Sequence, residues 1–365
     1  MHVLFALGSN GSGQLGIGHK EDVSVPKQVL LPEDLSPEAS IRKIVAGGNH
    51  TLLLTEAGEL LWSGDSTTGA CGKVSPEQTA SEPQFHRVDL AGLGESPRVR
   101  LVAATWEASV IVCQSDNGKT DRVYTFGMGT KGELGQGELI VRTPAPSLIK
   151  DFPPAGTEVV DLVSCMGHIV AVLSNGEAYG WGNGRKGQLG APDEVVHTPR
   201  KIEGVGFPVT RAACGREFTC LFGDAERGEL LVLGSDKWDI RSHAPSNIAG
   251  WQDVGASWGN IYVLKQNRTL LSWGRNDHGQ ITPEALPRAT KIAIGSEHAL
   301  AQIEDGDVLA WGWGEHGNCG PLTNADAAKK QGNLIASSKY SPPGTKILSI
   351  GAGCATSWVS IKLPS

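Results

Sequence analysis

The stretch AGGNHTLLLTEAGELLWSG at Ala46–Gly64 and the glycine-rich turn ALGSNGSGQLG at Ala6–Gly16 both recur along the chain. The turn returns as TFGMGTKGELG at Thr125–Gly135 and as GWGNGRKGQLG at Gly180–Gly190. Weaker copies of the turn occupy Trp62–Gly72, Leu231–Asp239, Ser272–Ile281 and Ala310–Gly320. A unit of this size is too small to bury its own apolar faces, so the seven copies must stack on one another. The pattern therefore predicts a repeat array.

Each unit contains the pattern of four antiparallel strands. In the first complete unit a strand at 44–47 ends in small residues, a second strand covers 51–55, and a third covers 59–62 after a tight turn. The segment Pro26–Leu30 lies between a glycine turn and the next unit and has the pattern of an outer strand, because proline is tolerated at a sheet edge. Four antiparallel strands per unit are typical of a propeller blade.

The spacing within the units is regular. The pairs His50/Gly64, His168/Gly182, Asn260/Gly274 and His298/Gly312 are each fourteen residues apart. First strands begin near Ile44, Leu101, Leu162, Arg211, Asp253, Lys291 and Leu348, whereas the N-terminus opens on a third strand. The last inner strands therefore lack outer partners, and the N-terminal strands lack inner ones.

Pairing the two chain ends closes a ring and removes its exposed sheet edges. The predicted fold is all-β: a seven-bladed β-propeller of four-stranded blades, closed by pairing of the N- and C-terminal strands. We expect residues 1–365 to form this single domain, with a composite closing blade from about 1–31 and 346–362.

Composition excludes several classes of function. A net charge of −7 and the absence of a Lys/Arg block argue against bulk nucleic-acid binding, which needs clustered cations. Seven cysteines without a C-x-x-C pair argue against a disulfide framework and indicate a reducing compartment, cytoplasmic or nuclear. No apolar run is long enough for a membrane span, and no basic leader precedes the first strand, so we expect no membrane or secretory address.

The repeat AGGNHTLLLTEAGELLWSG followed by GSGQLG resembles that of the regulator of chromosome condensation family of seven-bladed propellers, over nearly the whole chain. WD-type repeats fit poorly, because the recurrent Trp181, Trp273 and Trp311 are each followed by glycine. The family includes nucleotide-exchange factors, light sensors, inhibitors and scaffolds, so the resemblance implies a fold without fixing one function.

Among compact members, the chain is most similar to the killer-toxin-insensitivity proteins, also described as alpha-tubulin suppressors. This resemblance implies a non-enzymatic scaffold, a monomer or heterodimer in cytoplasm and nucleus. Its partner would be a small CSL-type zinc- or iron-binding protein, in Elongator-dependent tRNA wobble-uridine modification and diphthamide synthesis. The alternative is a guanine-nucleotide exchange factor for a small Ran-like GTPase, weakened by the lack of a basic tail before Val3. Light sensing is disfavoured, since no Gly-Trp-Arg-His-Thr run is present.

His50, His168 and His298 hold equivalent positions and raise the question of a metal site. They belong to non-adjacent units, whereas a zinc site needs ligands within about 2 Å of one ion, so a structural role is favoured. The glycine turns neither open a helix nor contain G-K-[ST], which disfavours phosphate binding. We expect no catalytic residues, metal or cofactor.

The departures from the repeat carry the functional prediction. Where the best copy has Gly47–His50, other copies place Trp106, Arg216 or Trp258. Turns between first and second strands emerge on the same face as the glycine loops, which contribute Trp238, Arg275 and Trp313. Trp and Arg are enriched at interface hot spots. We therefore predict a partner-binding face of Trp106, Arg216, Trp238, Trp258, Arg275 and Trp313; the alternative is that these tryptophans pack between blades.

Two long connections depart from the repeat length. The polar tract at 321–344 and the segment at 71–97 could each be a binding loop or a covering over neighbouring blades. The sequence leaves both alternatives open.

Overall fold

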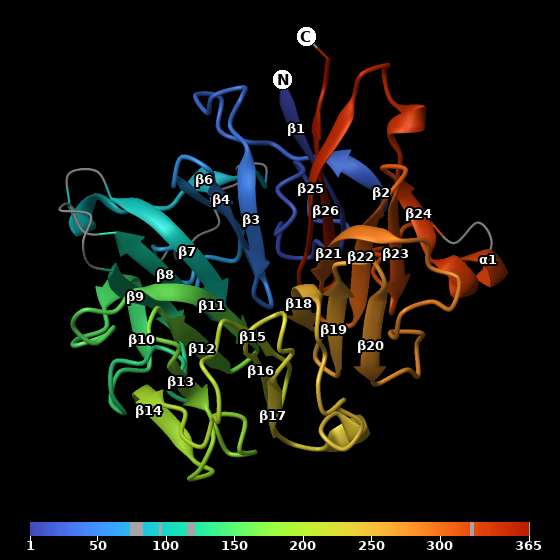
Figure 1. The fold of residues 1–365 in the computed structure, drawn as a ribbon. Coiled ribbons are helices and arrows are strands. Elements are labelled where there is room, and N and C mark those ends of the chain that lie inside the picture. Colours follow the sequence, from blue (N-terminus) through green and yellow to red (C-terminus); the bar gives the residue numbers. More distant parts are fainter. Residues whose placement is uncertain (74–82, 95–96, 115–120, 322–324, 365) are drawn as a thin grey trace.

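The computed structural model describes residues 1–73, 83–94, 97–114, 121–321 and 325–364. Seven antiparallel sheets surround a central axis, which confirms the predicted seven-bladed propeller (Figure 1). From the axis outward, blade 1 contains β3 (Ile41–Ala46), β4 (His50–Thr55), β5 (Leu60–Gly64) and β6 (His86–Arg87), and blade 2 contains β7 (Arg98–Ala104), β8 (Ala108–Gln114), β9 (Asp121–Met128) and β10 (Arg142–Leu148). In the same order, blade 3 contains β11 (Val159–Cys165), β12 (His168–Leu173), β13 (Ala178–Asn183) and β14 (Val195–Lys201), and blade 4 contains β15 (Arg211–Cys214), β16 (Phe218–Phe222) and β17 (Leu230–Gly234). Blade 5 contains β18 (Trp251–Ala256), β19 (Asn260–Lys265) and β20 (Leu270–Gly274), and blade 6 contains β21 (Ala289–Ile294), β22 (His298–Ile303), β23 (Val308–Gly312) and β24 (Asn333–Ala336).

Blade 7 is the closing blade and joins the two ends of the chain. Its strands, from the axis outward, are β25 (Lys346–Ala352), β26 (Thr356–Lys362), β1 (His2–Gly8) and β2 (Val23–Gln28). Strands β1 and β26 pair along their whole length, from His2 opposite Lys362 to Gly8 opposite Thr356. The termini lie close together in Figure 1. The predicted closure by N- and C-terminal strands is confirmed.

Blades 4 and 5 each have three regular strands, and a loop fills the outermost position. In blade 4 the 3₁₀ segment Lys237–Asp239 follows β17, and Trp238 and Asp239 have φ values of 61° and 56°. The chain then continues through turns, in which His243 N donates to Asp239 O at 2.9 Å and Ala244 N donates to Arg241 O at 3.1 Å, so this stretch forms no strand beside β17. In blade 5 Pro283 and Pro287 remove two backbone donors that an outer strand would use.

The fourteen-residue spacing has a direct structural cause. His50 lies opposite Gly64 in the β4–β5 pair, and His168, Asn260 and His298 face the corresponding glycines. Gly64 has a φ of 110°, and a Cβ atom there would lie 2.3 Å from the Asn49 carbonyl oxygen. Only glycine fits this left-handed position without displacing the turn.

The recurrent third-strand tryptophans lock adjacent blades together. Trp181 Nε1 donates to the Glu133 carbonyl at 3.0 Å, and Trp311 Nε1 donates to the Gln280 carbonyl at 3.2 Å. Each acceptor belongs to the glycine loop of the preceding blade. Both rings are buried, so their indole N–H groups need such partners. These tryptophans are structural.

The tract at 321–344 includes the outer strand of blade 6. In its described part, α1 (Ala325–Gln331) precedes β24, and a 3₁₀ turn at Ser338–Tyr340 leads toward β25. Similarly, the described part of 71–97 includes β6 and a 3₁₀ turn at Ala91–Leu93. Residues 74–82, 95–96 and 322–324 of these tracts lie outside the described residues. Both tracts thus supply outer strands, a role that neither of the two sequence-based alternatives included.

Candidate functional site

The turns between first and second strands gather at one end of a central cavity of ≈330 Å³. First strands from all seven blades line this cavity. At this end, backbone bonds cross from blade to blade: Trp106 N donates to Met166 O at 2.8 Å, Arg216 N to Trp258 O at 3.0 Å. Trp258 N in turn donates to Ser296 O at 2.8 Å. These bonds fix the turn residues relative to one another, so the side chains they carry have defined positions.

Trp106 and Trp258 meet across this end of the cavity. They belong to blades 2 and 5, which are separated by two blades, yet their ring centroids are 6.0 Å apart. The Arg216 guanidinium lies 5.9 Å from the centre of the Trp258 ring. This distance is within the range of a cation–π contact. One aromatic pair and one arginine therefore join residues from blades 2, 4 and 5.

A second group is centred on Arg275, on the loop after β20. Its guanidinium lies 5.3 Å from the ring centre of Trp238 and 5.9 Å from that of Trp313. The His278 ring stacks on Trp313 with a 4.5 Å centroid separation and an interplanar angle of 12°. This group links glycine loops from blades 4, 5 and 6.

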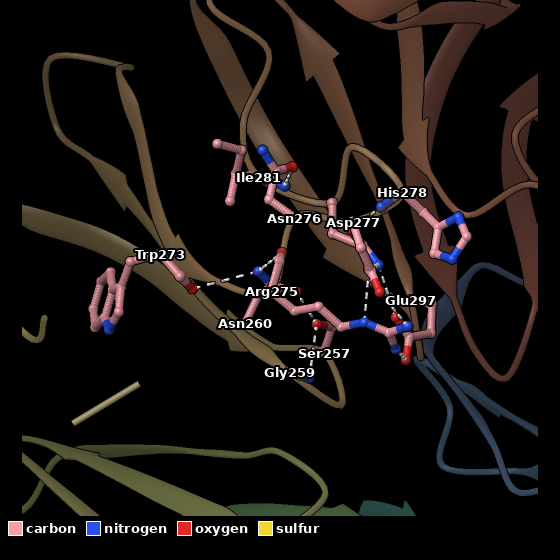
Figure 2. Close-up of polar contacts among 11 residues, drawn as sticks. Ser257, Gly259, Asn260, Trp273, Arg275, Asn276, Asp277, His278, Ile281 and Glu297 are labelled. Carbon is pink, nitrogen blue, oxygen red and sulfur yellow. Dashed lines mark hydrogen bonds and ion pairs between the residues drawn. The ribbon is translucent and has the colours of Figure 1, made fainter. Parts of the chain in front are cut away.

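Arg275 is held by two carboxylates. Figure 2 shows its side chain reaching toward Asp277 and Glu297, with distances of 2.7 Å from Nη2 to Asp277 Oδ2 and 2.6 Å from Nη1 to Glu297 Oε1. The hydrogen bond from Arg275 lowers the pKa of Asp277 to about 2. Glu297 is buried and also accepts a bond from Gln280. Asp277 is thus charged at neutral pH, and the Arg275 guanidinium is paired with two carboxylate groups.

Glycines in neighbouring turns make room for these large side chains. A Cβ atom on Gly48 would lie 2.5 Å from Trp106 Cε2, and one on Gly259 would lie 2.9 Å from Trp238 Cζ3. A large side chain in one blade therefore rests on a bare backbone in the next. Gly48 and Gly259 therefore leave the space that the indoles of Trp106 and Trp238 occupy.

The structure brings all six predicted residues together, from blades 2, 4, 5 and 6. We call Trp106, Arg216, Trp238, Trp258, Arg275 and Trp313 the tryptophan–arginine cluster. Trp106 is 38% exposed and Trp313 is 36% exposed, while Trp238 and Trp258 are half-buried. The cluster is thus a surface feature, unlike buried Trp181 and Trp311. Its role in partner binding stays a prediction.

Three further members of this surface are absent from the sequence-based prediction. Lys237 places its Nζ 4.3 Å from the centre of the Trp238 ring, His278 stacks on Trp313, and Glu297 anchors Arg275. Glu297 did carry a signal, because it replaces Asn49 of the best repeat with a charged residue in an otherwise small turn. Lys237 and His278 lie on variable loops and carried no such signal.

The three repeat histidines connect adjacent blades. His50 Nε2 lies 3.0 Å from Ser109 Oγ, His168 Nε2 is 3.0 Å from Thr219 Oγ1, and His298 Nε2 is 2.9 Å from Ser357 Oγ. Each bond joins a histidine blade to the next blade of the ring. Within the described part of the chain, no group of three or more His, Cys, Asp or Glu side chains could hold a metal ion. The histidines have the structural role favoured by the sequence.

Comparison with known proteins defines the family. The model of the RCC1-like domain matches residues 3–359, and this chain belongs to that family. An RCC1 repeat-containing protein of Schizosaccharomyces pombe is 32% identical, over 99% of this chain and 99% of its own length. The secretion-regulating guanine nucleotide exchange factor of Mus musculus is 26% identical, over 100% of this chain and 84% of its own.

A solved structure shares the fold. Prp20p of Saccharomyces cerevisiae, studied for its binding to Gsp1p and histones, superimposes with a TM-score of 0.80 at 20% identity. The match covers 100% of this chain and 92% of Prp20p. The comparisons thus support an RCC1-like propeller with exchange-factor relatives. None of these three proteins supports the role in Elongator or diphthamide chemistry that the sequence resemblance implied. The described helices include none long and apolar enough to cross a membrane.

Proposed function

We propose that this protein binds a small folded protein through the tryptophan–arginine cluster, and that the partner is a small GTPase whose nucleotide exchange it promotes. The observation that carries the docking proposal is the convergence of four tryptophans and two arginines on one face. Aromatic and arginine side chains at the centre of an interface commonly contribute most of its binding energy. The exchange-factor relative supports the choice of a GTPase.

The cluster is well suited to docking because its side chains are pre-organised. Backbone bonds between blades hold the turns of Trp106, Arg216 and Trp258, and two carboxylates hold Arg275. Little side-chain freedom remains to be lost when a partner binds, which favours affinity. The scaffold role with a CSL-type metalloprotein remains the second candidate from the sequence, without support among these relatives.

The double variant Trp106→Ala/Trp258→Ala tests the docking face. We expect GDP release from a responsive Ran-like GTPase to be accelerated by the wild-type protein and at least about tenfold less by the variant, because each anchor is typically worth about 2 kcal/mol. Stopped-flow release of a fluorescent GDP analogue measures this, and binding of a CSL-type protein is measured in parallel by calorimetry. Tyr340→Ala, at an 84% exposed residue outside the cluster, is the matched control and should behave as wild type.

Thermal melting separates docking from packing. The double variant should melt close to the wild type, since Trp106 is exposed, Trp258 is half-buried and neither belongs to a hydrophobic core cluster, whereas Trp181→Ala should melt far lower because that ring is buried. Unchanged exchange in the folded double variant would refute the cluster as the docking face. Two results together would favour the scaffold role over the exchange role: the wild-type protein accelerates exchange on no GTPase, and the double variant loses the binding of the CSL-type protein that the wild type shows.

A further inference from the structure

A small pocket opens within the tryptophan–arginine cluster, between blades 4 and 5. Its volume is ≈90 Å³, and Arg216, Glu217, Lys237, Trp238 and Trp258 are among its lining residues. Two cations and two indoles thus line one pocket.

The two cations of this pocket differ from Arg275 in their pairing. The Arg216 guanidinium lies 5.9 Å from the Trp258 ring centre, and Lys237 Nζ lies 4.3 Å from that of Trp238. Unlike Arg275, neither forms an ion pair with a carboxylate of the described residues. Both charges therefore remain available to an external anion. The contacts with the Trp258 and Trp238 rings restrict the positions of the two charged groups.

The pocket's charge indicates the kind of anion. Arg216 and Lys237 contribute two positive charges, and half-buried Glu217 contributes one negative charge. A net charge of about +1 matches a single carboxylate better than a phosphate, which carries about −1.5 to −2 at neutral pH. The ring of Trp238 already makes cation–π contacts with Lys237 and Arg275, so the pocket is unsuited to a cation of the partner.

We propose that this pocket receives an Asp or Glu side chain of the partner protein, held between the charges of Arg216 and Lys237 and against the rings of Trp238 and Trp258. This inference rests on the proposed docking face and adds the chemistry of the partner: an acidic residue flanked by apolar ones. The backbone supports such a built site. Trp238 has a φ of 61°, a costly conformation for a bulky residue, and it places the indole over Gly259 at the pocket wall.

The test uses a defined probe, so it does not depend on knowing the partner. The probe is N-acetyl-glutamate amide, and the matched neutral probe is N-acetyl-glutamine amide. We expect the acidic probe to shift the indole N–H resonances of Trp238 and Trp258 in a saturable manner, while the neutral probe leaves them unchanged. Buried Trp181 is the internal reference. Equal responses to both probes would overturn the proposal.

Variants locate the response. Arg216→Met/Lys237→Met removes both charges but keeps apolar side chains beside the indoles, and should weaken the acidic probe at least about tenfold, as expected for charge-assisted bonds. The control Arg185→Met/Lys186→Met removes two exposed cations from the glycine loop of blade 3 and should bind the probe as wild type does. Equal weakening in the control variant, or no weakening in the pocket variant, would overturn the proposal.

Two further arms separate this inference from the proposed function. Inorganic phosphate that shifts the same resonances with higher affinity than the acidic probe would show that the anion class is wrong. Normal GTPase exchange by Arg216→Met/Lys237→Met would refute the pocket while leaving the docking face intact. Conversely, the wild-type protein could bind the acidic probe in the pocket while Trp106→Ala/Trp258→Ala promotes exchange normally. This pair of results would refute the cluster as the docking face for the GTPase and leave the pocket as a carboxylate-binding site.

Discussion

Deletion of residues 1–16 is expected to turn a cooperatively folding protein into an aggregating one. The deletion removes β1, which lies between β26 and β2 in the closing blade and pairs with both. Without it, β26 becomes an exposed edge and the outer strand β2 loses its partner. Light scattering and size-exclusion chromatography measure the result. A truncated chain that stays monomeric with an unchanged melting temperature would contradict closure by the chain ends.

A point variant measures the same closure quantitatively. Leu7 in β1 is fully buried and packs in a core cluster that includes Leu300 and Val359. Leu7→Ala should therefore lower the free energy of unfolding by about 2–5 kcal/mol. Val25→Ala in β2 is the matched control, because Val25 is exposed, and should change stability by no more than about 0.5 kcal/mol. Denaturant titration provides both values.

Acid should destabilise the propeller at a pH where most carboxylates are still ionised. Burial lowers the pKa of His50, His168 and His298 from the ordinary 6.5 to about 4. The unfolded chain therefore binds protons more readily than the folded one between these values, so stability is complete above pH 6.5 and falls as the pH drops toward 4. Each histidine is worth about 3 kcal/mol over this window.

Denaturant titrations between pH 7 and 4 test this expectation. The slope of unfolding free energy against pH should approach three protons near pH 5, and His298→Gln should reduce it by about one proton. His243→Gln removes an exposed histidine and serves as the control, with a slope like that of the wild type. A free energy of unfolding that is flat from pH 6.5 to 4.5 would contradict the role of the buried histidines as neutral inter-blade links.

Much of the architecture could be predicted because it depends on local repetition. The fourteen-residue spacing reflects residues that face each other across one hairpin, such as His50 and Gly64. The ring closure followed from the offset between first and third strands. The cluster could be predicted because alternate turns of an antiparallel blade emerge at the same end. These features require no knowledge of distances between blades.

Other features depend on contacts between blades and could not be predicted. Turns at 239–244 take the place of the outer strand in blade 4, and Trp238 has a left-handed backbone that its residue type does not require. Arg275 forms an ion pair with Glu297, which lies twenty-two residues further on and in another blade. Lys237 and His278 gain their roles only by packing on tryptophans. Sequence spacing does not encode these distances.

Hydroxyl-radical footprinting of the complex tests most directly whether the partner docks on the tryptophan–arginine cluster. The protein is oxidised alone and with the partner that responds in the exchange or calorimetric assay, and modification rates are read at each aromatic residue. We expect rates at exposed Trp106 and Trp313 to fall severalfold on binding, while the rate at Tyr340 stays unchanged. Unchanged rates at both tryptophans, with protection elsewhere on the propeller, would contradict docking on this cluster.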